Sequence, residues 1–397
     1  MSQPNRRPQR YPFNGPVGIG LSPEYTLAQA GHGLARVQLP HGEPAWLATR
    51  YDDVRRVLGD RRFSRAEAAN HDEPRNSAYR SGDGILSMDP PDHTRLRAVA
   101  APAFSVRRVE HLRPRVREIV RQLIDELLTQ EEPVDFVESF AQPLPIRVIC
   151  EVLGVPGADR QQFQVWTDAQ ISTSALSQGQ FDTSMAELRQ YISMQVTDRR
   201  ASPRDDLISV IATAHVQDPQ QWTEQELVDL CVGILVAGYE STATQLANFV
   251  YVLLTQPERW HQLIGDPDIV PSAVEELMRY VAIGIGADFP RYATEDVELG
   301  GELVRAGAPV LASTSAANWD SSRFANPERV MFDRSGIGHL GFGYGAHHCL
   351  GAPLARLELQ EALRGLTSQL SSLSVAALPQ WRTNTLLRGP RRMLVGW

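Results

Sequence analysis

Apolar residues recur at helical spacing through most of the middle of the chain, from about residue 104 to about residue 260. One run falls every three or four residues and comprises Val116, Ile119, Val120, Leu123, Ile124 and Leu127. A later run comprises Leu359, Ala362, Leu363, Leu366 and Leu370. Because this spacing places the side chains on one face of a helix, each run predicts an amphipathic helix with a buried face.

The longest helical pattern begins at Thr223. In "TEQE", Glu226 follows Thr223 at the spacing of a reciprocal capping box. No proline interrupts the chain before Pro257, so we expect a helix over residues 223–256, about 50 Å long at about 1.5 Å per residue. Its segment "LCVGILV" is apolar on all sides, which predicts that the helix lies in the core.

Short strand patterns lie near both ends of the chain. "ARVQLP" and "PAWLATR" fall in residues 1–60 and predict a small sheet, followed by the helical "YDDVRRVLGD". After about residue 290, "VELGGELVRAGAPVLAS" alternates strands with turns. "MDPPDH" at residues 88–93 is typical of a turn that opens a helix. No internal repeat or linker divides the sequence, so we expect one domain over 1–397, mainly α with a smaller β region.

Composition excludes several functions. With 397 residues, 42% of them hydrophobic, the chain can bury a large core. Its net charge of −8 and its lack of a long basic run argue against nucleic acid as a partner. No segment of about 20 uninterrupted apolar residues occurs, so a cytoplasmic protein without a membrane span is expected. All 39 residues counted as lysine or arginine are arginine, which excludes lysine chemistry such as the pyridoxal-phosphate Schiff base.

The glycine-rich stretch "HLGFGYGAHHCLG" at residues 339–351 allows three interpretations. A zinc site would need His347, His348 and Cys349 to converge, and adjacent side chains seldom do so. A dinucleotide-binding loop could use the GxGxxG spacing that begins at Gly336, but more loop follows these glycines where a helix should begin. The third interpretation needs Cys349 alone.

Cys349 stands at the expected amino terminus of the helix "APLARLELQEALRGL". The helix dipole and the free backbone amides at this end favour a thiolate. Gly343, Gly345 and Gly351 let the backbone turn tightly and let a flat cofactor lie close to the sulfur. A lone thiolate that faces a flat cofactor suggests the axial ligand of haem iron.

A polar insertion, "AGYESTAT", interrupts the apolar part of the long helix. Gly238 is followed there by Glu240, Ser241, Thr242 and Thr244. Hydroxyl groups at such positions can bond to the carbonyl four residues earlier. These residues either cap a local fault in the helix or open the helix to admit a ligand, and we favour the second interpretation.

In this order, the motifs resemble the cytochrome P450 family over nearly the whole chain. "FGYGAHHCLG" is similar to the family's haem-binding signature, "AGYEST" to its oxygen-activating helix and "EELMR" to its ExxR pair. "DPPDHTRLR" and "PRYATED" are similar to segments that hold the haem propionates. The finer likeness is to actinobacterial members that tailor macrolides and other polyketides. The resemblance implies a single-domain haem-thiolate monooxygenase that hydroxylates or epoxidises a secondary metabolite.

The resemblance also implies roles for residues of this sequence. Cys349 would bind the iron of haem b. The other haem contacts would be His93, Arg97, Ala237, Gly238, Arg291, Phe342, Gly343, His347 and Gly351. The candidate catalytic residues are Glu240, Ser241 and Thr242. A structural network would join Glu276, Arg279 and Arg329. The candidate substrate contacts are Gly233, Val236, Ala237, Ala287, Phe289, Leu386 and Leu387, with Asp72 and Glu73 placed to meet a basic amino sugar.

The family's chemistry implies O2 as co-substrate and electrons from a separate ferredoxin and reductase, and we expect a monomer. A docking face for the ferredoxin would use Arg95, Arg107, Arg108, Arg113, Arg115 and Arg117, although solvated surface arginines explain this group equally well. The sequence departs from the family at Ser241, where threonine is usual, and at Trp319 and Val330. Two alternatives stay open: a haem protein of this fold that binds a ligand or recruits a partner without oxidising it, and oxidation of a substrate that is not a polyketide.

Overall fold

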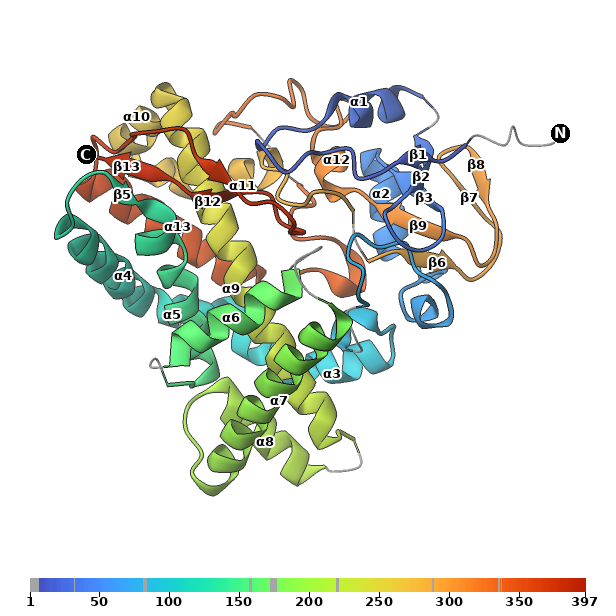
Figure 1. Cartoon of the computed structure of the whole chain (residues 1–397), viewed down its shortest axis with the longest axis horizontal. Coiled ribbons are helices and arrows are strands. Elements are labelled where there is room, and N and C mark those ends of the chain that lie inside the picture. The colour runs from blue at the N-terminus through green and yellow to red at the C-terminus, as the bar shows by residue number, and fades with distance from the viewer. Residues whose placement is uncertain are drawn as a thin grey trace.

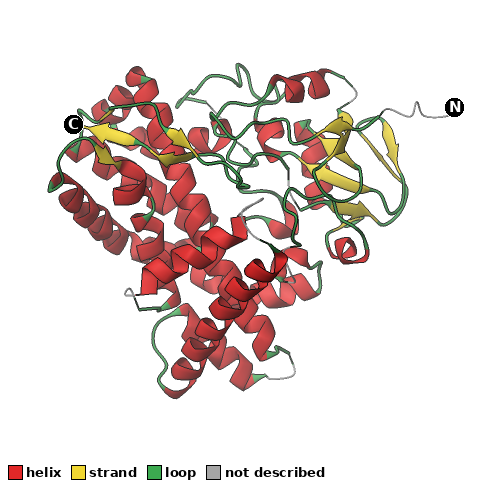
Figure 2. Cartoon of the chain, viewed as in Figure 1, coloured by secondary structure: helices red, strands yellow, loops and turns green. Residues whose placement is uncertain are grey.

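The computed structural model describes residues 7–397 except 32, 81–83, 157–158, 172–176, 219–220, 288, 335 and 337. Helices form most of the molecule, and groups of strands lie at its two ends (Figure 1, Figure 2). The strands β1 to β3 lie near the N-terminus, whereas β5 and β13 lie near the C-terminus (Figure 1). The predicted architecture, mainly α with a smaller β region, is confirmed.

The helices among the described residues are α1 Pro23–Ala30, α2 Tyr51–Gly59, α3 Asp92–Ala100, α4 Val106–Leu128, α5 Pro143–Leu153, α6 Arg160–Ile171, α7 Gln178–Ala201, α8 Leu207–Gln217, α9 Glu224–Thr255, α10 Pro257–Gly265, α11 Val270–Tyr280, α12 Thr314–Asn318 and α13 Ala352–Gln369. The strands are β1 Gln9–Arg10, β2 Leu34–Gln38, β3 Ala45–Ala48, β4 Phe63–Ser64, β5 Val134–Asp135, β6 Arg291–Ala293, β7 Val297–Leu299, β8 Glu302–Val304, β9 Pro309–Ala312, β10 Ser374–Val375, β11 Gln380–Trp381, β12 Pro390–Arg392 and β13 Leu394–Gly396.

The long helix predicted from residue 223 is α9, which runs through the middle of the helical part (Figure 1). Both bonds of its capping box are present: Glu226 N–H donates to Thr223 Oγ1 at 3.2 Å, and Thr223 N–H donates to Glu226 Oε2 at 2.9 Å. Helices α5, α7 and α13 pack against it. By length and composition α9 could span a membrane, but 67% of its most apolar window is buried inside the protein. This burial is what the core helix of a globular protein shows.

The two amphipathic helices predicted from the apolar runs are α4 and α13, and they pack against each other. The six apolar positions of the first run are at most 2% exposed. Gly365 permits the close approach, because a Cβ there would lie 2.5 Å from Val120 Cγ1. Burial of each large apolar side chain contributes about 1.5–3 kcal/mol, so this interface anchors the helix that follows the cysteine loop.

The main sheet combines strands from distant parts of the chain. Its order is β1-β2-β3-β9-β6-β4, with β3 and β9 parallel and β6 antiparallel to β9. The sequence predicted a sheet within residues 1–60 and further strands after about residue 290, but not that β9 and β6 join that sheet or that β4 forms its edge. A second sheet, β10-β13-β5, joins the C-terminal strands to β5, and β11 pairs with β12 as a hairpin. This hairpin brings the end of the chain onto α9.

Candidate active site

The cysteine loop is shaped by two glycines. Gly343 and Gly345 both have φ of 72°, and a Cβ on Gly345 would lie 2.3 Å from the Leu58 carbonyl oxygen. These two positions need glycine, as predicted. Gly351, the residue before α13, has φ of −81° and open space around it, so the prediction that the turn depends on this glycine is wrong. The Cys349 N–H donates to the Phe342 carbonyl at 2.8 Å, which closes the loop.

The Cys349 thiol is accessible at the start of α13, yet protein atoms surround most of it. Burial raises its pKa, while the backbone amides of Gly351 and Ala352 and the nearby Arg97 act in the opposite direction. The net pKa is raised, so the helix terminus alone does not make the stabilised thiolate that the sequence suggested. A metal ion bound at this sulfur would supply the missing positive charge, because coordination deprotonates a thiol.

Polar groups from three separate segments meet beside this loop. The rings of His93, on α3, and His347, in the loop, lie 4.2 Å apart. His93 Nδ1, His347 Nε2 and the Nε of Arg291, on β6, are buried and have no hydrogen-bond partner among the described residues. Burial lowers the pKa of His93, and burial together with the Arg291 charge lowers the pKa of His347 to about 4.

Buried polar atoms of this kind are normally paired. Carboxylate groups of a ligand at this place would satisfy them, which is the chemistry of the two haem propionates. Arg97 lies at the same place, and its Nη2 donates to the His348 carbonyl at 2.6 Å. The residues that the resemblance assigned to the propionates therefore converge, and they fit the group.

One face of α9 is exposed although the helix lies in the core. Gly233, Ala237 and Ser241 are exposed and stand four residues apart, so they share a stripe of the helix. The Ser241 hydroxyl donates to the Ala237 carbonyl at 2.7 Å, and this predicted bond is confirmed. Val236 beside the stripe is partly buried. The stripe makes Ser241 accessible to a ligand.

The predicted local opening of α9 is absent from the described structure, because the helix continues without a break from Glu224 to Thr255. Gly238 instead serves packing: a Cβ there would lie 2.9 Å from Ile149 Cδ1 on α5. Thr242 is buried, 6% exposed, and does not share the stripe of Ser241. Gly238 is partly buried and Thr242 is buried, so neither belongs to the exposed stripe, and their proposed haem and catalytic roles stay predictions.

Glu240 is buried, 1% exposed, and its Oε2 accepts a hydrogen bond from Arg382 Nη1 at 2.6 Å. Arg382 stands between β11 and β12, 142 residues further along the chain. The sequence gave no sign of this partner, because a contact between such distant segments has no local periodicity. Glu240 is thus an ion-paired acid and does not stand in open solvent.

The candidate substrate contacts near the C-terminal loop and β6 divide into residues that are at least partly exposed and one residue that is buried. Leu386 and Leu387 are partly buried, and their segment lies beside the one that precedes β6, since the Ile285 N–H donates to the Leu386 carbonyl at 3.0 Å. Phe289 is 49% exposed. Ala287 is buried in a cluster with Tyr11, Tyr25 and Leu311. Ala287 is therefore a core residue.

The two acids proposed to meet an amino sugar already have cationic partners. Asp72 accepts from Arg75 at 2.7 Å and from Arg80 at 2.9 Å, and Glu73 accepts from Arg65 at 2.7 Å. Both carboxylates are paired, so a basic amino sugar would have to compete with these arginines, and the proposed contact stays a prediction.

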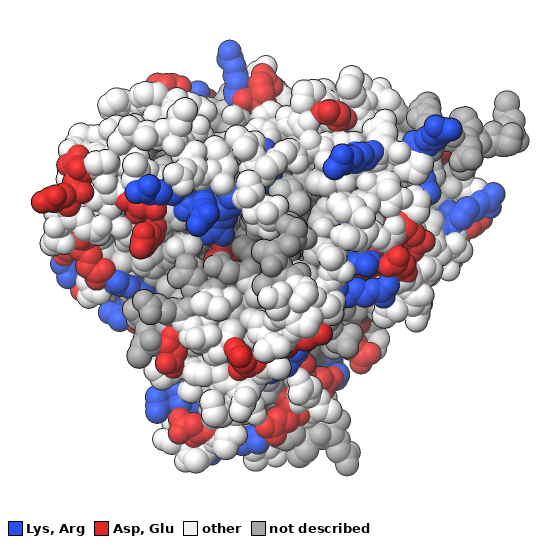
Figure 3. All heavy atoms as spheres, viewed as in Figure 1, with Lys and Arg blue, Asp and Glu red and all other residues white. Residues whose placement is uncertain are grey.

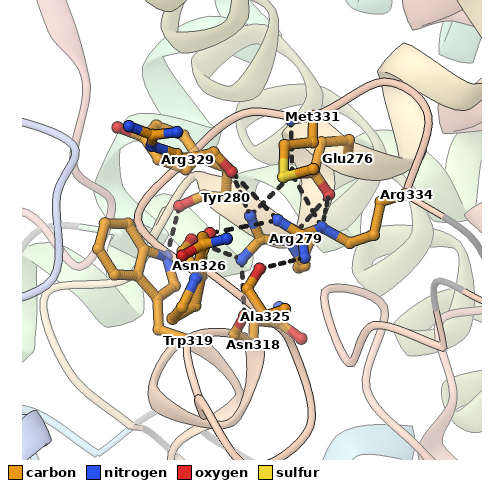
Figure 4. Close-up of polar contacts among 11 residues, drawn as sticks. Glu276, Arg279, Tyr280, Asn318, Trp319, Ala325, Asn326, Arg329, Met331 and Arg334 are labelled. Carbon is orange, nitrogen blue, oxygen red and sulfur yellow. Dashed lines mark hydrogen bonds and ion pairs between the residues drawn. The ribbon is translucent and has the colours of Figure 1, made fainter.

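The ExxR pair lies in a fully buried network (Figure 4). Arg279 donates to both oxygens of Glu276, at 2.8 and 2.9 Å, and to the carbonyls of Asn318 and Pro327. Arg329 takes part only through its backbone: its carbonyl lies 3.0 Å from Arg279 Nη2, and its N–H donates to the Asn326 carbonyl at 3.0 Å. Its side chain points away (Figure 4).

The side chain expected from Arg329 is supplied by Arg334, whose Nε donates to both oxygens of Glu276. The sequence interpretation missed Arg334, although an arginine five residues after Arg329 was the available sign. Trp319 donates from Nε1 to the Tyr280 carbonyl at 2.8 Å, and Val330 is buried. Both departures from the family pattern are therefore accommodated by packing.

A group of charged side chains that the sequence did not reveal packs against Phe342 of the cysteine loop. The Arg356 guanidinium lies 4.4 Å from the ring centre of Phe342. Glu275 holds Arg356 at 2.6 and 3.0 Å and pairs with His339 at 3.0 Å. This group fixes Phe342, whose ring contacts Arg356 and whose carbonyl accepts the hydrogen bond from the Cys349 N–H.

The arginines considered as a docking face are mostly neutralised. Five of the six form an ion pair with a carboxylate at 2.9 Å or less, and they are Arg95, Arg108, Arg113, Arg115 and Arg117. Acidic and basic side chains are likewise interspersed over the described surface seen in Figure 3. Among the described residues of this group, Arg107 alone has no such ion pair.

Comparison with known proteins agrees with this site. The family model for cytochrome P450 matches residues 175–389. The mycinamicin IV hydroxylase/epoxidase of Micromonospora griseorubida is 48% identical over 394 residues, covering 98% of this chain and 99% of that protein. The nocardicin C N-oxygenase of Nocardia uniformis subsp. tsuyamanensis is 45% identical, covering 98% of each chain.

Solved structures agree as well. The crystal structure of HinD with NMFT and NO has a TM-score of 0.95 and 45% identity, and covers 99% of this chain and 100% of that one. The mixed-function P450 MycG has a TM-score of 0.92 and 48% identity, with 98% of this chain and 100% of that one covered. The chain belongs to the cytochrome P450 family of haem-thiolate monooxygenases.

Proposed function

We propose that this monooxygenase hydroxylates or epoxidises a macrolide or another polyketide, with haem b as its cofactor. The observation that carries the proposal is the convergence of Cys349 with the unpaired buried polar atoms of His93, Arg291 and His347. The 48% identity to the mycinamicin IV hydroxylase/epoxidase supports the substrate class, and so does the 39% identity to the monooxygenase PikC.

Haem bound here would supply reductive activation of O2 and insertion of one oxygen atom into a C–H bond or an alkene. Cys349 would hold the iron. His93, Arg97, Arg291 and His347 would pair with the propionates and so orient the cofactor. Electrons would come from a separate ferredoxin and its reductase, and the enzyme would act as a monomer.

The α9 stripe would face the reacting atoms. The Ser241 hydroxyl donates its one proton to the Ala237 carbonyl, so it would accept a hydrogen bond from a proton-carrying group, and would turn away from Ala237 to pass its own proton on. Glu240 would return protons toward that hydroxyl once its carboxylate leaves Arg382. The aliphatic side chains of Val236, Leu386 and Leu387 would exclude water from the bound substrate.

A second substrate class has its own support. The acids that would have met a basic amino sugar, Asp72 and Glu73, are held by arginines. The nocardicin C N-oxygenase, at 45% identity, carries nitrogen oxidation in its name. Oxidation of a nitrogen-containing metabolite that is not a polyketide is therefore the second candidate.

A substrate-induced spin-state titration separates the candidates. The ligands would be macrolides with and without an amino sugar, linear polyketides, small terpenoids and amino-acid-derived amides. We expect macrolides to give the largest spin-state shift, and we expect that shift not to require an amino sugar. Turnover of the same macrolide should yield an oxygenated product of increased mass. A shift with amides alone would favour the second candidate. A shift without any oxidised product would favour a binding protein of this fold.

A further inference from the structure

The loop that joins β11 to β12 lies against one stripe of α9. Glu240, Thr244 and Asn248 stand four residues apart and are all buried, so they share a face of the helix. The Asn248 side-chain amide donates to the Arg388 carbonyl at 2.8 Å. A Cβ on Gly389 would lie 2.6 Å from Thr244 Cγ2. The backbone of the loop thus contacts two successive turns of α9.

Arg382 makes the third contact, with the first turn of this stripe. Its Nη1 lies 2.6 Å from Glu240 Oε2, and the two side chains are only 12% and 1% exposed. The Arg382 N–H also donates to the Gly389 carbonyl at 3.0 Å, which closes the base of the loop. In a buried pair, removal of one partner leaves the other charge without compensation. Glu240 Oε1 has no hydrogen-bond partner among the described residues, so Arg382 carries much of that compensation.

The far end of the same loop holds the candidate substrate contacts. The Arg388 N–H donates to the Ile283 carbonyl at 2.6 Å, and Leu386 accepts from Ile285. The exposed stripe that ends at Ser241 is the neighbouring face of α9, about 100° around the helix at about 3.6 residues per turn. One short loop therefore carries both the candidate substrate contacts, Leu386 and Leu387, and the ion-pair partner of the acid, Arg382.

We propose that Arg382 is a positioning residue that makes the freedom of Glu240 depend on the loop that contacts the substrate. With the loop seated as it is here, Arg382 holds the Glu240 carboxylate on the buried stripe of α9, about 100° around the helix from Ser241. A substrate that displaces Leu386 and Leu387 moves the base of the loop and releases Glu240 to carry protons. This coupling rests on the proposed function. The Arg382–Glu240 ion pair and the contact of the loop with α9 do not depend on it.

The variants are Arg382→Gln, Arg382→Lys and the double change Arg382→Gln with Glu240→Gln. Arg392→Gln is the matched control, because Arg392 lies in the same hairpin, is 51% exposed and stands 3.9 Å from its acid. All variants are made as holoenzyme, and the thiolate spectrum under carbon monoxide verifies the fold of each one.

The first readout needs no turnover. In Arg382→Gln we expect an infrared band of a protonated carboxyl group, because an unpaired buried carboxylate takes up a proton. The band should be missing from the double variant, from Arg382→Lys and from the control. Amide hydrogen exchange in residues 382–388 should rise by about tenfold in Arg382→Gln, since opening of this loop loses a stabilising contact. A spectrum and an exchange rate like those of the control would overturn the proposal.

The second readout is coupling. Arg382→Gln should release at least about threefold more hydrogen peroxide per reducing equivalent, with substrate affinity within about twofold of wild type, because the proton-carrying group acts after binding. Arg382→Lys should restore most of the coupling. A merely structural role would lower affinity and coupling together in both variants, and that result would overturn the proposal. Wild-type enzyme that oxygenates no substrate would refute the proposed function, while the infrared band and the exchange rates would still decide on the pair.

Discussion

Arg334 reaches across 58 residues of sequence to Glu276, where its Nε lies 3.2 and 3.0 Å from the two carboxylate oxygens. Glu276 is fully buried, and its charge is shared between Arg334 and Arg279. The nearby Arg329 contributes backbone groups only. The segment that leads into the cysteine loop is therefore fixed to α11 by the side chain of Arg334.

Replacement of Arg334 by alanine should destabilise the protein strongly. Loss of one partner of a buried ion pair costs about 3–5 kcal/mol, because the other charge stays buried. Arg329→Ala is the matched control, since its side chain is exposed, and should change the free energy of unfolding by less than about 0.5 kcal/mol. Urea unfolding of both variants gives the comparison. Equal loss in the two variants would contradict the assignment of Arg334.

Glu275 should make the stability depend on acid pH. Burial by itself would raise its pKa, but hydrogen bonds from His339 and Arg356 outweigh it and lower the pKa to about 2. Because the folded pKa lies below the ordinary value of 4.5, this carboxylate stabilises the fold above about pH 4.5 and loses that contribution as the pH falls toward 2.

Glu275→Gln should accordingly be less stable than wild type near neutral pH, by up to about 3 kcal/mol. The difference should shrink as the pH is lowered from about 4.5, since wild type then protonates the carboxylate that the variant lacks. Urea unfolding at a series of pH values measures this difference. A gap between the two proteins that stays constant with pH would show that Glu275 titrates normally.

The helices were predictable because their signals are local. The capping box at Thr223 and the apolar run that ends at Leu127 each specify a helix from neighbouring residues. The main sheet was predictable only in part, because β3 pairs with β9 across more than 250 residues. No spacing in the sequence shows such a partner.

The candidate site was predictable where a motif carries it and not where geometry decides. Cys349 follows from its loop, but the choice between Arg329 and Arg334 depends on which side chain turns toward α11. Ser241 and Thr242 are adjacent in sequence, and only the rotation of α9 shows that the first is exposed and the second buried. The partner of Glu240 lies 142 residues away, so its pairing could not be read from the chain.

Removal of propionate partners should weaken haem retention. His93 Nδ1 and Arg291 Nε are buried without a partner among the described residues, so each should form a strong hydrogen bond with a carboxylate. We expect the double variant His93→Ala with Arg291→Ala to lose haem to an acceptor apoprotein at least about tenfold faster than wild type, for a loss of about 1.5–3 kcal/mol per bond. Arg107→Ala changes a surface arginine and should not alter the rate of haem loss. An unchanged rate in the double variant would refute the assignment of His93 and Arg291 to the propionates.

Replacement of Cys349 by serine should abolish the thiolate signature. A hydroxyl oxygen cannot supply the electron density of a thiolate, so the reduced protein under carbon monoxide should lose the strongly red-shifted Soret band, and turnover should stop. Cys150→Ala removes a buried thiol elsewhere and should keep the band. Monooxygenase activity that persists in Cys349→Ser would disprove the ligand assignment.

Ser241 should govern how tightly oxygen consumption is coupled to product. Its hydroxyl is oriented by the Ala237 carbonyl at 2.7 Å, but serine lacks the methyl group with which threonine restricts χ1. Ser241→Ala should therefore raise peroxide release per reducing equivalent by about threefold or more, because a positioned proton donor contributes about 10²-fold or more to the step it serves. Ser241→Thr should lower the release or leave it unchanged.

Thr255→Ala removes a hydroxyl that bonds in the same way to Tyr251 at the end of α9, and it should behave like wild type. Peroxide yield and product, measured together with the true substrate, give the comparison. Wild-type coupling in Ser241→Ala would show that the hydroxyl only satisfies the helix and that protons arrive by way of the substrate or ordered water.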